Sequence, residues 1–186
     1  MKKSTAIIIG NGSSQDLYKQ HLHVNDFVVV CNLNWFTPHD AVSIIDPQPI
    51  DYMYANGLMT KKPIWGNSKV ERLMHKYQLD LNLKLVHTRT MSMNNAQFAT
   101  VELCKQGYQN IHYYGCDTFW SEDMNSTQDK MIPRPYRDIK LYIRWRKIWH
   151  LLFKEFAQTK FYIHSPVNIE CIDYGDNATY HQHLVI

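Results

Sequence analysis

Short apolar runs recur along the chain and are separated by longer stretches of mixed polarity. Most of these runs lack polar alternation and are rich in isoleucine and valine, which is typical of strands that are covered on both faces. They predict buried strands at residues 5–9, 26–31, 41–45, 83–87, 111–114 and 161–163.

The stretches between the runs predict helices at residues 68–77, 94–105 and 138–157, with a shorter one at 16–21. Ser68 and Glu71 have the spacing of a capping box, and Asn94 or Asn95 can cap the second helix, which Gly107 ends. Because Tyr, Met, Gly and Pro crowd residues 48–65, we expect irregular structure there.

Strands that alternate with helices need crossover connections, which place neighbouring strands parallel. We therefore expect an α/β fold, with a single Rossmann-like domain over residues 1–186 and a mostly parallel sheet flanked by helices. Ligands of such sheets bind at the carboxyl ends of the strands. The residues that follow the predicted strands are glycine or polar at every exit: residues 10–14, Asn32, Asp46, residues 115–117 and residues 165–166.

The first of these exits reads Gly10, Asn11, Gly12, Ser13 and Ser14. Small residues let backbone N–H groups approach an anion, and the start of the following helix adds a partial positive charge. The third glycine of the dinucleotide fingerprint is missing, and no Walker lysine follows. Two interpretations stay open: a site for a phosphate-bearing ligand, and a tight strand-to-helix turn with no ligand.

Three blocks of sequence resemble the bacterial sialyltransferases of glycosyltransferase family 42. They are IIGNGSS (8–14) with VNDFVVVCNLNWF (24–36), then TMSMNNAQFATVELCKQGYQNIHYYGCD (90–117), and FYIHSP (161–166). The resemblance implies a Rossmann-like, GT-A-like sialyltransferase domain that binds a nucleotide sugar, CMP-sialic-acid-like or a UDP-sugar. It also implies transfer of the sugar to a hydroxyl acceptor.

The same resemblance implies roles for particular residues. Gly10, Asn11 and Gly12 would hold the nucleotide phosphate or ribose, with Ser13 and Ser14 beside them. Asn32 would contact the nucleotide near the transferred sugar, Ser92 would help to bind the donor, and Asp117 would lie in the nucleotide pocket. Asp46 with Pro47 stands where the family has Asn-Pro, and Met93 replaces a glycine of the family motif.

The histidine that the family uses in catalysis has no counterpart in KMIPRPYRDIK (130–140). Arg134, Tyr136 and Arg137 in that stretch offer donors for a leaving phosphate, although an exposed basic helix start would have the same composition. Asp46 leads the candidates for the general base because it follows a buried strand directly. The other candidates are Asp117, Glu122, Asp123 and His39. The alternative is a protein that binds a nucleotide or nucleotide sugar without catalysis.

Charge and composition add little beyond these motifs. A formal net charge of +3 permits an anionic ligand without demanding nucleic acid. The basic residues of 138–157 leave open two acceptors, a glycan and a modified DNA base. Since no Asp-x-Asp follows a strand, we expect no metal site, and the sequence predicts no cofactor. No segment resembles a signal peptide or a membrane span, so we expect a cytoplasmic protein.

Overall fold

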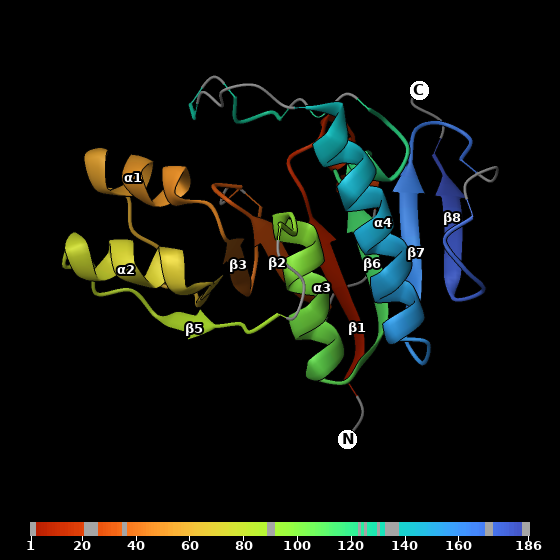
Figure 1. Cartoon of the computed structure of the whole chain (residues 1–186), viewed down its shortest axis with the longest axis horizontal. Helices are drawn as coiled ribbons and strands as arrows, with labels where there is room; N and C mark the ends of the chain where they lie inside the picture. Colours follow the sequence, from red (N-terminus) through yellow and green to blue (C-terminus); the bar gives the residue numbers. More distant parts are fainter. Residues whose placement is uncertain are drawn as a thin grey trace.

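One parallel sheet organises the molecule (Figure 1). The computed structural model describes residues 3–20, 26–34, 37–88, 92–122, 124, 126–129, 131–132, 138–169 and 173–183. The strands are β1 (Lys3–Ile9), β2 (Phe27–Cys31), β3 (Ala41–Ile44), β4 (Ile64–Gly66), β5 (Leu83–Leu85), β6 (Tyr108–Tyr114), β7 (Lys160–Ser165) and β8 (Ala178–Gln182). They lie in the order β5-β4-β3-β2-β1-β6-β7-β8, and each neighbouring pair is parallel. The expected α/β Rossmann-like fold is confirmed.

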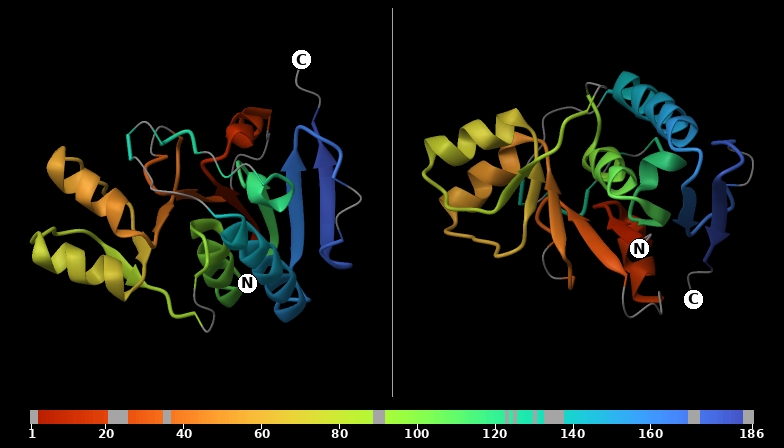
Figure 2. Two further views of the ribbon diagram at one scale, coloured as in Figure 1. Left: turned by 45° about the horizontal axis from the view of Figure 1, so that its top comes forward. Right: turned by 90° about the horizontal axis from the view of Figure 1, so that it is seen from below.

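Helices cover both faces of this sheet (Figure 2). The α-helices are α1 (Pro47–Ala55), α2 (Ser68–Lys76), α3 (Asn95–Lys105) and α4 (Ile139–Glu155), and two 3₁₀ helices are η1 (Ser13–Gln20) and η2 (Asp117–Phe119). Alternate side chains of β1 point to opposite faces of the sheet and therefore pack in different layers of the core. Ile7 and Ile9 pack with the buried residues of η1, α1 and α2, whereas Ala6 and Ile8 pack with those of α3 and α4.

The strand order reverses between β1 and β6. From β1 the chain builds β2, β3, β4 and β5 toward one edge, and from β6 it builds β7 and β8 toward the other. Connections that diverge at such a switch point leave a crevice at the carboxyl ends of the two strands, which is where ligands of open α/β sheets bind. The fold therefore directs attention to the turns that follow Ile9 and Tyr114.

The expectation of irregular structure over residues 48–65 is wrong. Helix α1 begins at Pro47, directly after Asp46, and β4 follows it. Proline at the first helical position costs no hydrogen bond because that N–H has no intrahelical partner. Ile50 and Met53 are then buried one turn apart, so two apolar anchors override an otherwise weak helical sequence.

Two smaller expectations also need correction. Helix α2 is capped by Asn67, whose side chain accepts from the N–H groups of Lys69 and Val70, and not by Ser68. The last strand, β8, is absent from the sequence-based expectation because its sequence, ATYHQ, is too polar to give the signal of a buried strand. It lies at the edge of the sheet, where one side needs no partner. None of the helices within the described ranges has the length and apolar character that crossing a bilayer requires.

Three histidines, from β6, β7 and the position directly after β8, form a chain of rings on the face that η1 covers. His112 Nδ1 lies 2.9 Å from His164 Nε2, and His164 Nδ1 lies 2.7 Å from His183 Nε2. His183 Nδ1 lies 3.1 Å from Gln20 Oε1, which can only accept. His183 therefore donates from Nδ1 and accepts at Nε2, and the same tautomer is transmitted to His164.

Acidification is expected to destabilise this chain of rings. Desolvation, together with the nearby His181, lowers the pKa of His183 below its ordinary value of 6.5. Below about pH 6.5 the unfolded state therefore binds more protons than the folded state. The free energy of unfolding keeps its full value above that pH and decreases as the pH falls below it. The loss of about one hydrogen bond should lower the thermal midpoint by about 2–4 °C between pH 7.5 and 5.5. Scanning calorimetry of His183→Gln should show a smaller pH effect; an unchanged effect contradicts the assignment.

Candidate functional site

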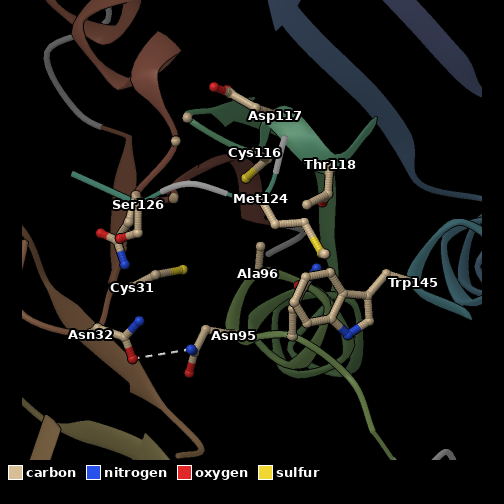
Figure 3. A pocket seen from close by; sticks show the side chains of 15 residues that line it. Cys31, Asn32, Asn95, Ala96, Cys116, Asp117, Thr118, Met124, Ser126 and Trp145 are labelled. Carbon is tan, nitrogen blue, oxygen red and sulfur yellow. Dashed lines mark hydrogen bonds between the residues drawn. The ribbon is translucent and has the colours of Figure 1, made fainter. Parts of the chain in front are cut away.

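A pocket opens at the switch point, over the carboxyl ends of β1, β2 and β6 and the start of α3 (Figure 3). Together with the solvent in its open mouth, the pocket occupies about 610 Å³. Its lining consists of Gly10, Asn11, Gly12, Cys31, Asn32, Asn94, Asn95, Ala96, Gly115, Cys116, Asp117, Thr118, Met124, Ser126 and Trp145. The site thus lies where the strand order predicts it.

The glycines of the first turn are required by the neighbouring turn after β6. The N–H of Gly10 donates to the carbonyl of Tyr114 at 2.7 Å, and that of Gly12 donates to the carbonyl of Gly115 at 2.8 Å. A Cβ on Gly10 would stand 2.2 Å from Gly115 O. These two N–H groups therefore hold the two turns together, and close packing accounts for both glycines without a ligand. Any ligand contact from this turn must come from other groups.

Asp117 connects the same two turns through its carboxylate. Oδ2 accepts from Ser13 Oγ at 2.9 Å and from the N–H of Ser14 at 3.3 Å, and Oδ1 accepts from Ser14 Oγ. Figure 3 shows this carboxylate directed away from Asn32 and Trp145. Three donors at the start of η1 thus engage the carboxylate, which gives Asp117 a structural role at the edge of the pocket.

Asn32 and Asn95 form a buried pair of amides on the pocket wall. Asn32, with φ of 54°, lies in the left-handed region that asparagine tolerates, directly after β2. Its Oδ1 accepts from Asn95 Nδ2 at 3.0 Å, the bond drawn in Figure 3. Asn95 Oδ1 in turn accepts from the N–H of Ile45 at 2.9 Å. The first turn of α3 thus connects the exits of β2 and β3.

Asn11 has a comparable partner in Gln128. Gln128 Nε2 donates to Asn11 Oδ1 at 2.9 Å, and Gln128 Oε1 accepts from the N–H of Leu33 at 3.2 Å. The N–H of Thr127 donates to the carbonyl of Asn11 at 2.8 Å. Gln128 is 6 % exposed, so its hydrogen bonds are largely shielded from water. The segment after η2 therefore closes one side of the pocket through Asn11.

An aromatic ring borders the opposite side of the pocket. Trp145 of α4 lies there beside Met124, as Figure 3 shows. Its Nε1 donates to the carbonyl of Ser92 at 3.0 Å, and its own carbonyl accepts from Gln97 Nε2 at 2.7 Å. These bonds hold the indole at the pocket, where its face can stack on a base.

Cys116 also lines the pocket, and burial raises the pKa of its thiol well above the ordinary value. A thiol held protonated in this way is a poor nucleophile. Covalent catalysis by Cys116 is therefore disfavoured, and its sulfur contributes to packing beneath the pocket.

The sequence-predicted residues divide into four groups. Gly10, Asn11, Gly12, Asn32 and Asp117 line this pocket. Ser13 and Ser14 bond Asp117 behind it. Asp46 and Ser92 line a second pocket, and Arg134, Tyr136 and Arg137 lie outside the described residues.

The second pocket adjoins the first through the bond between Ile45 and Asn95. Ile45 and Asp46 line it from the turn after β3, and Ser92 lines it from the segment before α3. Ser92 Oγ accepts from Arg144 of α4 at 3.2 Å. Its other polar lining residues are Asn67, Ser68, Lys69, His87 and Thr88. Asp46 is half-buried there, at the start of α1, and its side chain makes no capping bond.

Sequence reasoning does not assign Asn95, Gln128 or Trp145 to the site. The sequence indicates Asn95 only as a candidate helix cap, and Trp145 only as part of the predicted helix at residues 138–157. Gln128 lies outside the three blocks of sequence that carry the family resemblance. The doubled asparagine at the start of a helix is the one signal, because Asn94 alone satisfies the capping box with Gln97. Within the described part of the chain, no group of three or more His, Cys, Asp or Glu residues is arranged to hold a metal ion.

Comparisons with known proteins support the fold. No protein-family model matches the chain, and no curated protein matches it either. Among solved structures, the sialyltransferase CstII from Campylobacter jejuni, in complex with the substrate analogue CMP-3FNeuAc, matches with a TM-score of 0.53 and 17% sequence identity. The match covers 86% of this chain and 79% of that one. The chain therefore has a sialyltransferase-like fold.

Proposed function

We propose that the chain is a divergent member of glycosyltransferase family 42, forming one nucleotide-sugar-binding domain over residues 1–186. It binds a CMP-sugar or a UDP-sugar and transfers the sugar to a hydroxyl. One observation carries the proposal: a pocket lined by asparagines and bordered by an indole lies at the strand switch point of a sialyltransferase-like fold. The similar structure was solved with a CMP-sugar analogue.

The pocket offers a place for each part of a nucleotide. The face of Trp145 suits a base, and the side-chain amides of Asn11 and Asn32 suit phosphate or ribose oxygens. The start of α3 also faces the pocket, and the partial positive charge of a helix N-terminus favours a phosphate. Arg134, Tyr136 and Arg137 remain proposed phosphate ligands, from the stretch that precedes α4.

The transfer forms one bond and breaks another at the anomeric carbon. An oxygen of the acceptor hydroxyl attacks that carbon, and the bond to the phosphate oxygen breaks with its electron pair leaving on CMP. The hydroxyl proton passes to a general base. We assign this role to Asp46, because it directly follows β3 and lines the pocket next to the nucleotide pocket. Asp117 is the other proposed carboxylate, and its three bonds with Ser13 and Ser14 favour a positioning role.

The proposal is tested by donor turnover. CMP should raise the thermal midpoint of the protein, and incubation with CMP-sialic acid plus a glycan acceptor should release CMP and glycosylated product. Asp46→Asn should lower the transfer rate by about 10²–10⁴-fold while CMP binding persists, as expected for loss of a general base. The exposed Asp80→Asn is the matched control and should retain full activity. Absence of stabilisation by CMP and UMP alike would refute nucleotide binding.

A second candidate is a nucleotide-binding protein without catalysis. The lack of histidine in residues 130–140 favours it, as does the engagement of Asp117 by two serines. In that case CMP stabilises the protein, yet no CMP is released from the donor with any acceptor. Both acceptor classes should be offered, a glycan and duplex DNA with hydroxymethylated bases, because exposed Lys140, Arg144 and Lys147 on α4 would suit a phosphate backbone.

A further inference from the structure

We infer that Asn95 and Gln128 are positioning residues, which turn the side-chain amides of Asn32 and Asn11 so that nitrogen, not oxygen, faces the ligand. The site would then select ligand atoms that accept hydrogen bonds, such as phosphate, ribose and carbonyl oxygens. The identity of that ligand as a nucleotide rests on the proposed function, whereas the amide orientation does not.

Two chains of hydrogen bonds, here called relays, fix these amides. The first relay runs from Ile45 through Asn95 to Asn32, and it starts at a backbone group that can only donate. The N–H of Ile45 points at the Asn95 side chain, so the atom that it meets must be the oxygen, Oδ1, at 2.9 Å. Asn95 Nδ2 is thereby placed toward Asn32 and donates to its Oδ1 at 3.0 Å. The ordinary ambiguity between amide oxygen and nitrogen is removed, because each step fixes the next.

Burial makes this relay selective. Asn32 is 3 % exposed and Asn95 is 7 % exposed, so an amide turned the wrong way would set two N–H groups or two oxygens against each other without water to compensate. Figure 3 shows the nitrogen of Asn32 on the side of the pocket and its oxygen toward Asn95. Asn32 therefore turns its amide nitrogen toward the pocket.

The second relay has the same logic on the other side of the pocket. The N–H of Leu33 also can only donate, and it meets Gln128 Oε1 at 3.2 Å. Gln128 Nε2 then donates to Asn11 Oδ1 at 2.9 Å. With its oxygen held by Gln128, Asn11 retains the amide nitrogen for the pocket that it lines. The two relays start after the neighbouring strands β3 and β2, and each of them turns an amide nitrogen toward the pocket.

A stability cycle tests the orientation without any ligand. In Asn95→Asp the new carboxylate oxygen meets Asn32, whose amide rotates and donates to it; in Asn32→Asp the carboxylate accepts from Asn95. Each single variant keeps its hydrogen bond, but the double variant sets two carboxylates about 3 Å apart. Its thermal midpoint should fall roughly 5 °C below the sum of the two single shifts. Asn95→Asp should also lower the midpoint more than Asn32→Asp, because only Asn95→Asp replaces the donating atom and forces the neighbouring amide to rotate. Additive shifts, or the reverse order of the two single variants, would overturn the inference.

A binding experiment tests the consequence for the ligand. Titration calorimetry with CMP should show roughly a 10-fold or greater loss of affinity in Asn95→Asp, because Asn32 then turns its oxygen to the ligand. Asn94→Asp is the matched control: Asn94 lines the same pocket and caps α3 through its oxygen, so the variant adds the same charge and leaves Asn32 untouched.

The inference requires Asn95→Asp to lose clearly more affinity for CMP than Asn94→Asp loses. Equal losses of affinity would contradict it. Gln128→Glu should act like Asn95→Asp through Asn11, with the exposed Gln78→Glu as its control. If the wild-type protein binds no CMP, the proposed function fails, whereas the stability cycle still decides the orientation of the amides.

Discussion

Replacing Gly10 by alanine is expected to lower the thermal midpoint by about 6–12 °C and to abolish ligand binding at the pocket. The new Cβ would stand 2.2 Å from the carbonyl oxygen of Gly115 and 2.8 Å from its carbonyl carbon. These are backbone atoms of a buried turn, so they cannot move aside as a flexible side chain can. Overpacking of this kind costs about 3 kcal/mol, which corresponds to that shift in a chain of this size.

Two comparison variants separate the clash from a general effect of losing glycine. At Gly57, with φ of 61°, a Cβ would have no atom of the described residues within 4 Å, so Gly57→Ala should cost only the roughly 1 kcal/mol of a left-handed alanine. Gly12→Ala would meet the Asp117 carboxylate at 2.4 Å. Because that obstacle is a side chain, Asp117→Ala should partly rescue Gly12→Ala but not Gly10→Ala. Equal midpoints for Gly10→Ala and Gly57→Ala would contradict the explanation.

The second large effect is expected at Trp149, the fully buried centre of α4. Its ring stacks on Phe119 of η2 with centroids 4.3 Å apart and meets Tyr113 of β6 edge-on at 5.3 Å. Trp149→Ala should cost about 3–5 kcal/mol, or about 10–15 °C in the thermal midpoint, because it opens a cavity between helix and sheet. Circular dichroism melts measure this shift directly.

Trp149→Phe should cost far less than Trp149→Ala. Within the described structure the indole Nε1 is buried without a hydrogen-bond partner, and phenylalanine removes that unsatisfied donor while keeping a ring against Phe119. Leu151→Ala on the exposed side of the same helix, where Leu151 is 59% exposed, should change the midpoint little. A melt in which Trp149→Phe is as damaging as Trp149→Ala would contradict this explanation.

The central strands and their exits were predictable because continuous runs such as AIII and VVV bury both faces of a sheet. Turn residues at Gly10 and Asn32 follow these runs directly, so the location of the pocket also followed from the sequence. Helix α1 escapes sequence reasoning because tertiary burial of Ile50 and Met53 outweighs the local proline content.

The relays around the pocket were not predictable in the same way. Asn95 and Gln128 act through bonds to residues far away in the sequence, Asn32 and Asn11, and no local pattern records such a pairing. Asp46 and Asp117 line two different pockets, and this difference likewise depends on which strands become neighbours in the sheet. Sequence reasoning places both carboxylates at strand exits, but only the structure shows that Ser13 and Ser14 engage one of them.

The bonds between the turns after β1 and β6 have a consequence for folding. Strand β1 pairs with β6 in a register that matches Ile9 with Tyr114, so the central pair of the sheet closes a loop spanning more than half of the chain. The chain loses the entropy of closing this long loop before the contacts between β1 and β6 can stabilise it, and this slows folding. A nascent chain in which β6 has not yet been synthesised has only half of the pocket floor, so the complete pocket forms only late in synthesis.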